Sequence, residues 1–157
     1  MQAFVKREAK HYDNEALKHV LDTYRVSMSI AIQNRRDVLD RALQTYRQTQ
    51  SQALATRRAD IDAAITVRRN AVNTAEAAWK GKCASTNKDE RTAANKTFRD
   101  AVRAAQAAYR QAANTANTAY QATMKTAKAT RAAAEKQARE QYQANAKAAR
   151  LALQGGD

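Results

Sequence analysis

The sequence contains no proline, a single cysteine and three glycines in 157 residues. Proline is the strongest helix breaker, so its absence removes the usual interruption of a helix. Cys83 has no second cysteine to pair with, which excludes an internal disulfide and a cysteine metal cluster and leaves a free thiol or a link between two chains. The abundant Ala, Arg, Gln, Lys and Glu are good helix formers. These features predict a chain that is helical nearly from end to end.

Long apolar runs and catalytic motifs are also absent from the sequence. No segment approaches the roughly 18 apolar residues of a membrane span, and residues 1–10 lack the apolar stretch of a secretion signal. We expect a cytoplasmic protein if the sequence is complete, and an extracellular or cell-surface one if a signal has been removed. His11 and His19 have no partner residues for a metal site, and there is no phosphate-binding glycine loop or nucleophile elbow. We therefore predict a protein that is not an enzyme, with no metal, cofactor or small-molecule substrate.

A repeat of eleven residues is present instead. Tyr24-Arg25, Arg35-Arg36 and Tyr46-Arg47 follow one another at this interval, so a row of large residues runs beside a row of positive charges. Eleven residues in three turns give about 3.67 residues per turn, so such a stripe stays on one helix face with a slight right-handed drift. In the first half the stripe contains Leu17, Leu21, Tyr24, Met28, Ile32, Arg35, Leu39, Leu43, Tyr46, Gln50, Leu54, Arg57, Ile61, Ile65, Arg68, Val72, Glu76 and Trp79. In the second half it contains Phe98, Val102, Ala105, Tyr109, Ala113, Ala116, Tyr120, Met124, Ala127, Arg131, Glu135, Ala138, Tyr142, Ala146, Ala149 and Leu153.

Helix stop and start signals coincide in the segment GKCASTNKDE, residues 81–90. Gly81 suits the left-handed position after a helix end, and Asn87 with Glu90 suits a capping box at the next helix start. We predict an N-terminal extension at 1–13, a helix over 14–80, a loop at 81–87, a helix over 88–153 and a tail at 154–157. Two helices of about 100 Å each favour an all-α antiparallel hairpin, a near-straight or slightly right-handed coiled coil. The narrow stripe indicates that hairpins pack into a larger helical assembly.

Four arginines occupy stripe positions that would ordinarily be apolar. One interpretation is that these arginines form salt bridges across the seam, the line along which the two helices pack, and so fix the register. The other is that they line a groove that faces a polyanion. With the turn centred near Ser85, the expected partners across the seam are Glu135 for Arg35, Asp100 for Arg68, and Asp37 or Asp40 for Arg131. Arg57 could pair with Asp60 on its own helix.

The formal net charge of +13 is concentrated in the second half, where no acidic residue occurs between Ala101 and Ala134. Basic residues flank the stripe on both predicted helices, either as a solvated surface or as a face that contacts phosphates. The residues expected to bind a polyanion are Arg25, Arg36, Arg47, Arg58, Arg69, Arg99, Arg103, Arg110, Lys125 and Lys128.

Three functions are consistent with these patterns. The leading hypothesis is a structural protein whose hairpins pack on identical neighbours into a filament, sheath or bundle. The alternative is a protein that coats nucleic acid or another polyanion through its basic flanks, and the third is a membrane-surface binder, which the mainly alanine stripe of the second half disfavours. Cys83 is a candidate inter-chain thiol. The expected packing residues are Tyr24, Tyr46, Trp79, Phe98, Tyr109, Tyr120 and Tyr142.

Overall fold

Two long helices make up the chain in a computed structural model, which describes the backbone of residues 2–154 and the side chains of residues 15–154. Helix α1 spans Gln2–Cys83 and helix α2 spans Lys88–Gln154. They pack against each other as an antiparallel hairpin, and no strand occurs in the described residues, so the predicted all-α fold is confirmed.

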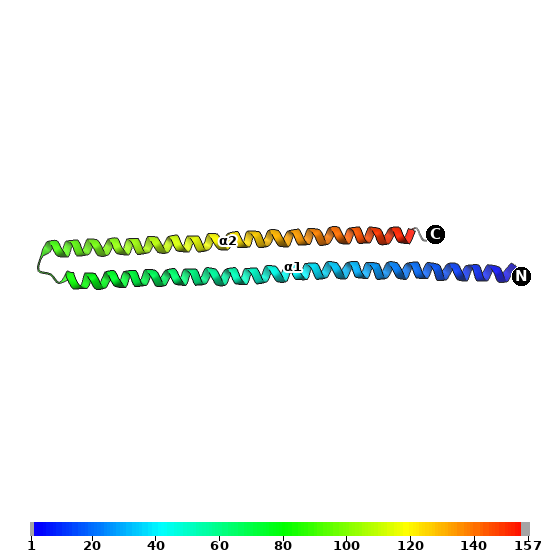
Figure 1. Cartoon of the computed structure of the whole chain (residues 1–157), viewed down its shortest axis with the longest axis horizontal. Coiled ribbons are helices and arrows are strands. Elements are labelled where there is room, and N and C mark those ends of the chain that lie inside the picture. Colours follow the sequence, from blue (N-terminus) through cyan, green and yellow to red (C-terminus); the bar gives the residue numbers. More distant parts are fainter. Residues whose placement is uncertain (1, 155–157) are drawn as a thin grey trace. The chain divides into compact units, whose positions relative to one another are not determined.

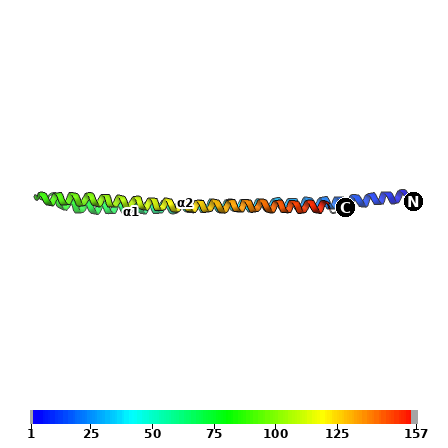
Figure 2. The same cartoon turned by 90° about the horizontal axis from the view of Figure 1, so that it is seen from above.

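The hairpin divides into two compact units. Unit 1 combines residues 1–47 with residues 128–157, and unit 2 comprises residues 48–127. Figures 1 and 2 show α1 and α2 side by side within each unit. In unit 1, the N-terminal part of α1 continues beyond the end of α2 (Figure 1). Neither helix, in the range the structure describes, holds a segment apolar enough to cross a bilayer.

The turn lies later in the chain than its glycine indicated. Gly81 is inside α1 with an ordinary helical backbone, because α1 continues to Cys83 and no described glycine has a positive φ. The expected left-handed stop at Gly81 is therefore wrong. The predicted extension at 1–13 also lies within α1 from Gln2 onward, whereas α2 begins at the predicted Lys88.

Asn87 caps α2 as predicted, since its Oδ1 accepts the backbone N–H of Asp89 at 2.9 Å. Glu90, the other residue of the predicted capping box, does not bond directly to the backbone N–H of Asn87 but through the Ser85 hydroxyl. Glu90 Oε2 accepts from the hydroxyl of Ser85 at 2.6 Å, and the Ser85 hydroxyl accepts the backbone N–H of Asn87 at 3.1 Å. Arg91 closes the turn by donating to the backbone carbonyl of Ser85 at 2.7 Å.

Alanine forms the centre of the interface between the helices. Eight of the nine buried side chains are alanines and the ninth is Met124, while no described side chain is less than 2% exposed. Buried alanines recur at eleven-residue steps along each helix. We call a set of positions that are eleven residues apart on one helix a column. The buried alanines are Ala31 and Ala64 on α1, and Ala94, Ala105, Ala116, Ala138, Ala146 and Ala149 on α2.

The stripe predicted for α2 is confirmed, but the stripe predicted for α1 is displaced to one side. Ala31 and Ala64 lie in the interface, whereas Leu21 and Ile32 of the predicted stripe are exposed. The bulkier column of α1 is thus not the buried one. A column of alanine lets two helix backbones approach closely, which moves larger side chains to the edge of the contact.

Candidate functional site

A ladder of arginine–tyrosine pairs runs along the interface in each unit. In unit 2, the Cζ atoms of Arg57 and Arg68 lie 5.5 and 5.0 Å from the ring centroids of Tyr120 and Tyr109. These distances are those of cation–π contacts. Each step of eleven residues forward on α1 is matched by eleven residues backward on α2, so both pairs occupy one register.

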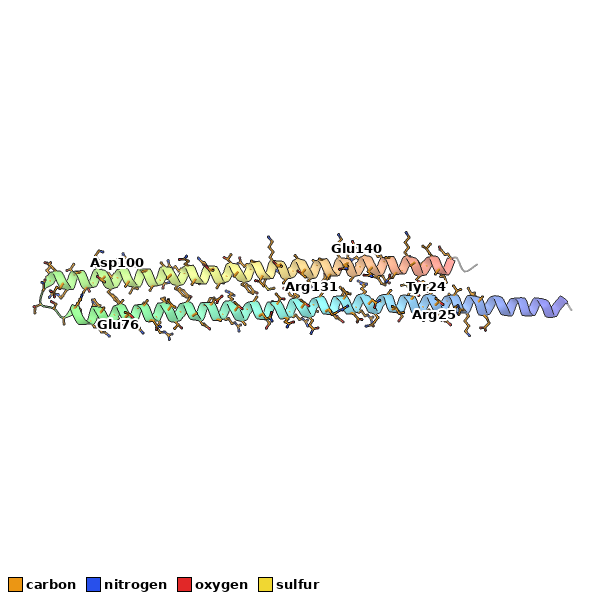
Figure 3. The ribbon with its side chains drawn as sticks, in the orientation of Figure 1. Tyr24, Arg25, Glu76, Asp100, Arg131 and Glu140 are labelled. Atoms are coloured by element: carbon orange, nitrogen blue, oxygen red, sulfur yellow. The ribbon has the colours of Figure 1, made fainter. Side chains whose placement is uncertain are left out.

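Unit 1 holds two pairs in this same register. Arg35 Cζ lies 5.5 Å from the ring centroid of Tyr142, and Arg131 Cζ lies 5.6 Å from that of Tyr46. In the second of these pairs the arginine is on α2. Figure 3 shows Arg131 directed toward the space between the helices, and Asp100 and Glu140 directed away from it.

An aromatic pair closes the ladder next to the turn. The rings of Trp79 and Phe98 are 5.8 Å apart between centroids, with 36° between their planes. A small cavity of about 380 Å³ lies beside them, lined mainly by alanine and by these two rings. Edge or offset contacts between aromatic rings at this distance are favourable, so the pair stabilises the part of unit 2 next to the turn.

Side-chain amides on α2 satisfy the donors of α1 in unit 2. The acceptors form one column, three residues before each aromatic partner, which we call the amide column: Asn95, Gln106 and Asn117. Trp79 Nε1 donates to Asn95 Oδ1 at 2.7 Å, Arg68 Nη1 to Gln106 Oε1 at 3.1 Å, and Arg57 Nε to Asn117 Oδ1 at 2.6 Å. The seam arginines of this unit are thus bonded without using a carboxylate.

The predicted salt bridges across the seam do not form. Every ion pair among side chains 15–154 joins residues three or four apart on one helix. Glu135 pairs with Arg131 at 2.7 Å instead of Arg35, and Asp100 pairs with Lys96 at 2.9 Å instead of Arg68. Arg35 lies opposite Tyr142, seven residues beyond the expected Glu135, so the predicted register is wrong by about two helical turns.

The order of arginine and tyrosine along the ladder defines the register. A slip of one eleven-residue repeat would set Arg131 opposite Arg35 in one direction and opposite Arg57 in the other. Two like charges in a half-buried seam are unfavourable, whereas the observed register pairs every seam arginine with a ring. The single reversed pair, Tyr46–Arg131, thereby excludes both neighbouring registers.

One face of unit 2 carries a groove with small and mostly uncharged lining residues. Residues of both helices line it, including Thr49, Thr56 and Asp60 of α1 with Ala119 and Thr123 of α2. The groove therefore brings one flank of α1 and one flank of α2 onto the same face of unit 2, and the opposite flanks of the two helices lie together on the second face. That second face carries Leu54 and Arg58 of α1 and the amide column of α2.

The equivalent second face of unit 1 is cationic. At further eleven-residue steps along α2, the positions of the amide column are occupied by lysine and arginine. The flank of α1 on the same face carries a row of arginines. All are exposed. We call this surface of unit 1 the cationic face, and it consists of Arg25, Arg36, Arg47, Lys128, Arg139 and Arg150.

Lys80, Lys96 and Asp100 have shifted pKa values, and each of them belongs to an ion pair on one helix. A hydrogen bond and the charge of Glu76 raise the pKa of Lys80 above its ordinary value. Lys96 and Asp100 act on each other likewise, so the pKa of Lys96 is raised, and that of Asp100 is lowered mainly by its hydrogen bond to Lys96. Both pairs are exposed, and neither is near a group that could use the shift for catalysis.

The predicted packing residues and predicted polyanion-binding residues lie on different surfaces. The seven aromatic residues are half-buried, and all except Tyr24 form the ring contacts of the ladder described above. The ten predicted polyanion-binding residues are exposed, and among the side chains that the structure describes only Arg25 and Arg103 of this set form ion pairs, with Asp22 and Asp100. The predicted set ends at Lys128 and does not include Arg139 and Arg150. These two residues follow Lys128 at steps of eleven, so extending the repeat along α2 would have identified them.

Cys83, the candidate inter-chain thiol, ends α1 and is half-buried. Its Sγ lies 3.5 Å from the backbone carbonyl oxygen of Lys80, a contact that fixes the side chain locally. No cluster of three potential metal ligands occurs in the described residues.

Comparisons with family models, curated proteins and solved structures found no match to this chain.

Proposed function

We propose that this protein is a self-assembling structural protein, whose helical hairpins pack side by side into a filament, sheath or bundle. The proposal is supported by apolar surface that the hairpin leaves uncovered. Val26, Ile30, Val67 and Leu151 are each more than half exposed, at 59%, 55%, 64% and 57%. Large aliphatic side chains on flanks away from the seam are accounted for by packing on another chain.

The composition of the seam adds support. An interface centred on alanine buries little apolar area, and two helices alone leave most of their surface in water. Additional helices would cover the exposed residues. The groove of unit 2, lined mostly by alanine and threonine, is a surface that a helix of a second chain can approach closely.

The test is sedimentation of the full chain over a range of concentrations at near-physiological salt. Wild-type protein is expected to form multimers whose size rises with concentration. The Val26→Glu/Ile30→Glu variant places two charges on one exposed patch of α1 and is expected to sediment as a smaller species. Gln44→Glu/Gln48→Glu is the matched control, because it adds the same charge at the same spacing on an exposed polar part of α1.

Sedimentation of wild-type protein as a monomer at every concentration would contradict the proposal. Equal loss of assembly in the two variants would instead attribute association to net charge. Coating of nucleic acid is the competing function, and the exposed cations alone support it. It predicts assembly only when nucleic acid is present, so nuclease treatment before sedimentation separates the two.

A further inference from the structure

The cationic face of unit 1 has an aliphatic column along its middle. Leu21 and Ile32 are 37% and 39% exposed, and Leu43 follows in this column as a half-buried residue. Eleven-residue periodicity places the column between the seam and the arginine row of α1. The lysine and arginine row of α2 lies on the other side of the seam, so cations flank the aliphatic column on both sides.

Most of the cations on this face form no ion pair with a described side chain. Of its six cations, Arg25 alone forms an ion pair among the described residues, at 3.4 Å from Asp22. In unit 2 the same column of α2 consists of amides that are hydrogen-bonded to α1. In unit 1, Arg139 stands where Gln106 stands in unit 2, so Arg35 is offered a second cation instead of an acceptor.

We propose that the cationic face binds the surface of an anionic membrane, with unit 1 lying flat on the lipid headgroups. Lysine and arginine rows attract lipid phosphates, and aliphatic side chains between them become dehydrated against the acyl-chain boundary. Neither feature alone gives firm attachment. Together they supply the two signals, charge and apolar contact, that stable binding to a membrane surface requires.

The aliphatic column distinguishes lipid from the other anionic partners. A nucleic acid backbone neutralises lysine and arginine but leaves leucine and isoleucine side chains uncovered. A second copy of this face is also excluded as the occupant, because two cationic faces repel each other. This inference is independent of the proposed assembly, which uses Val26 and Ile30 on another flank of α1.

The structure changes the expectation for membrane binding drawn from sequence. The alanine-rich stripe of α2 predicted weak lipid contact. In the hairpin, however, α1 supplies the aliphatic side chains and α2 supplies one of the two flanking cation rows. The amphipathic surface is therefore formed by both helices together.

The test is flotation of the full chain with large unilamellar vesicles at about 0.1 M salt. Vesicles contain either phosphatidylcholine alone or phosphatidylcholine with about 30% phosphatidylglycerol. Wild-type protein is expected to float with the anionic vesicles and to remain in solution with the neutral ones. Circular dichroism of each variant confirms that its helices are retained.

Two variants separate the contributions of charge and apolar contact. Lys128→Gln/Arg139→Gln/Arg150→Gln is expected to weaken partitioning onto anionic vesicles at least about tenfold. Leu21→Ser/Ile32→Ser, which leaves the charge unchanged, is expected to weaken it by about tenfold as well. The matched control removes three exposed cations elsewhere and should bind as wild type: Arg41→Gln/Lys82→Gln/Lys88→Gln.

Three results would overturn the proposal. The first is absence of flotation with anionic vesicles. The second is equal loss in the control variant, which would mean that net charge alone is responsible. The third is full retention of binding in Leu21→Ser/Ile32→Ser together with displacement by a short DNA duplex, which would identify the face as a nucleic-acid surface.

Discussion

The guanidinium of Arg131 lies 5.6 Å from the ring centroid of Tyr46, with the arginine on α2 and the tyrosine on α1. The three other arginine–tyrosine pairs have the opposite order, as in Arg57–Tyr120. This reversal makes the observed register the only one, among shifts by one repeat, that keeps arginines apart. The contact therefore contributes to the specificity of the hairpin as well as to its stability.

Exchanging the members of this pair tests the register. Tyr46→Arg alone places two guanidinium groups opposite each other and is expected to lower the free energy of unfolding by about 1–2 kcal/mol. The double variant Tyr46→Arg/Arg131→Tyr restores a cation–π pair and should recover most of that loss. Urea unfolding followed by circular dichroism measures both. Additive losses in the double variant would contradict the contact.

Arg139→Gln is expected to stabilise unit 1. It replaces a cation beside Arg35 with an acceptor, recreating the arrangement of Arg68 and Gln106 in unit 2. One such hydrogen bond contributes about 0.5–1.5 kcal/mol. Arg139→Ala is the control, since it removes the charge without adding an acceptor. If glutamine is no better than alanine in thermal unfolding, Arg35 does not use the amide position.

Ala116→Leu is expected to destabilise unit 2. Ala116 is 4% exposed at the centre of the interface, so the extra methylene and methyl groups would push the helices apart. Overpacking of this kind costs about 1–3 kcal/mol. Ala122→Leu makes the same change on an exposed part of α2 and should leave the midpoint of urea unfolding nearly unchanged. Equal midpoints for the two variants would show that the helices do not pack through alanine.

Asp100 provides a prediction about pH. Its pKa is lowered mainly by the hydrogen bond and charge of Lys96, and to a smaller extent by Arg103. A lowered folded-state pKa stabilises the folded chain above the unfolded pKa, and this contribution is lost as the pH falls through the folded value. Both groups are exposed, so salt should weaken the effect.

The measurement is an NMR titration of the Asp100 carboxyl group. Lys96→Gln should raise its pKa toward the ordinary value, and Arg103→Gln should raise it less. A larger rise in Arg103→Gln would reverse the assignment of the dominant partner.

Much of the fold was predictable because the repeat is strong. Large residues such as Tyr46 and Tyr109 recur every eleven residues, and a nearly straight helix keeps positions with this period on one face. The antiparallel hairpin followed from one cluster of turn signals near Asn87. The burial of Ala31 and Ala64 was missed, since alanine is equally common on exposed and buried helix faces and bulkier side chains dominated the pattern.

The register was not predicted because it was inferred from the position of the turn. Helix α1 continues to Cys83 and α2 begins at Lys88, so the loop is still centred close to Ser85, and its position alone does not give the register. Matching each seam arginine to a tyrosine would have found the observed alignment from sequence, because the alternatives place Arg131 against another arginine. Across the seam the arginines lie over tyrosine rings and not beside carboxylates. The cationic face also required the register, since its rows come from different helices.

The central claim, that hairpins assemble through apolar packing, is tested most directly by electron microscopy of purified, nuclease-treated protein at near-physiological salt. The claim predicts ordered filaments, sheets or bundles that persist when the salt concentration is raised, because apolar packing is not screened. Isolated hairpins under these conditions, assembling only after nucleic acid is restored, would contradict it.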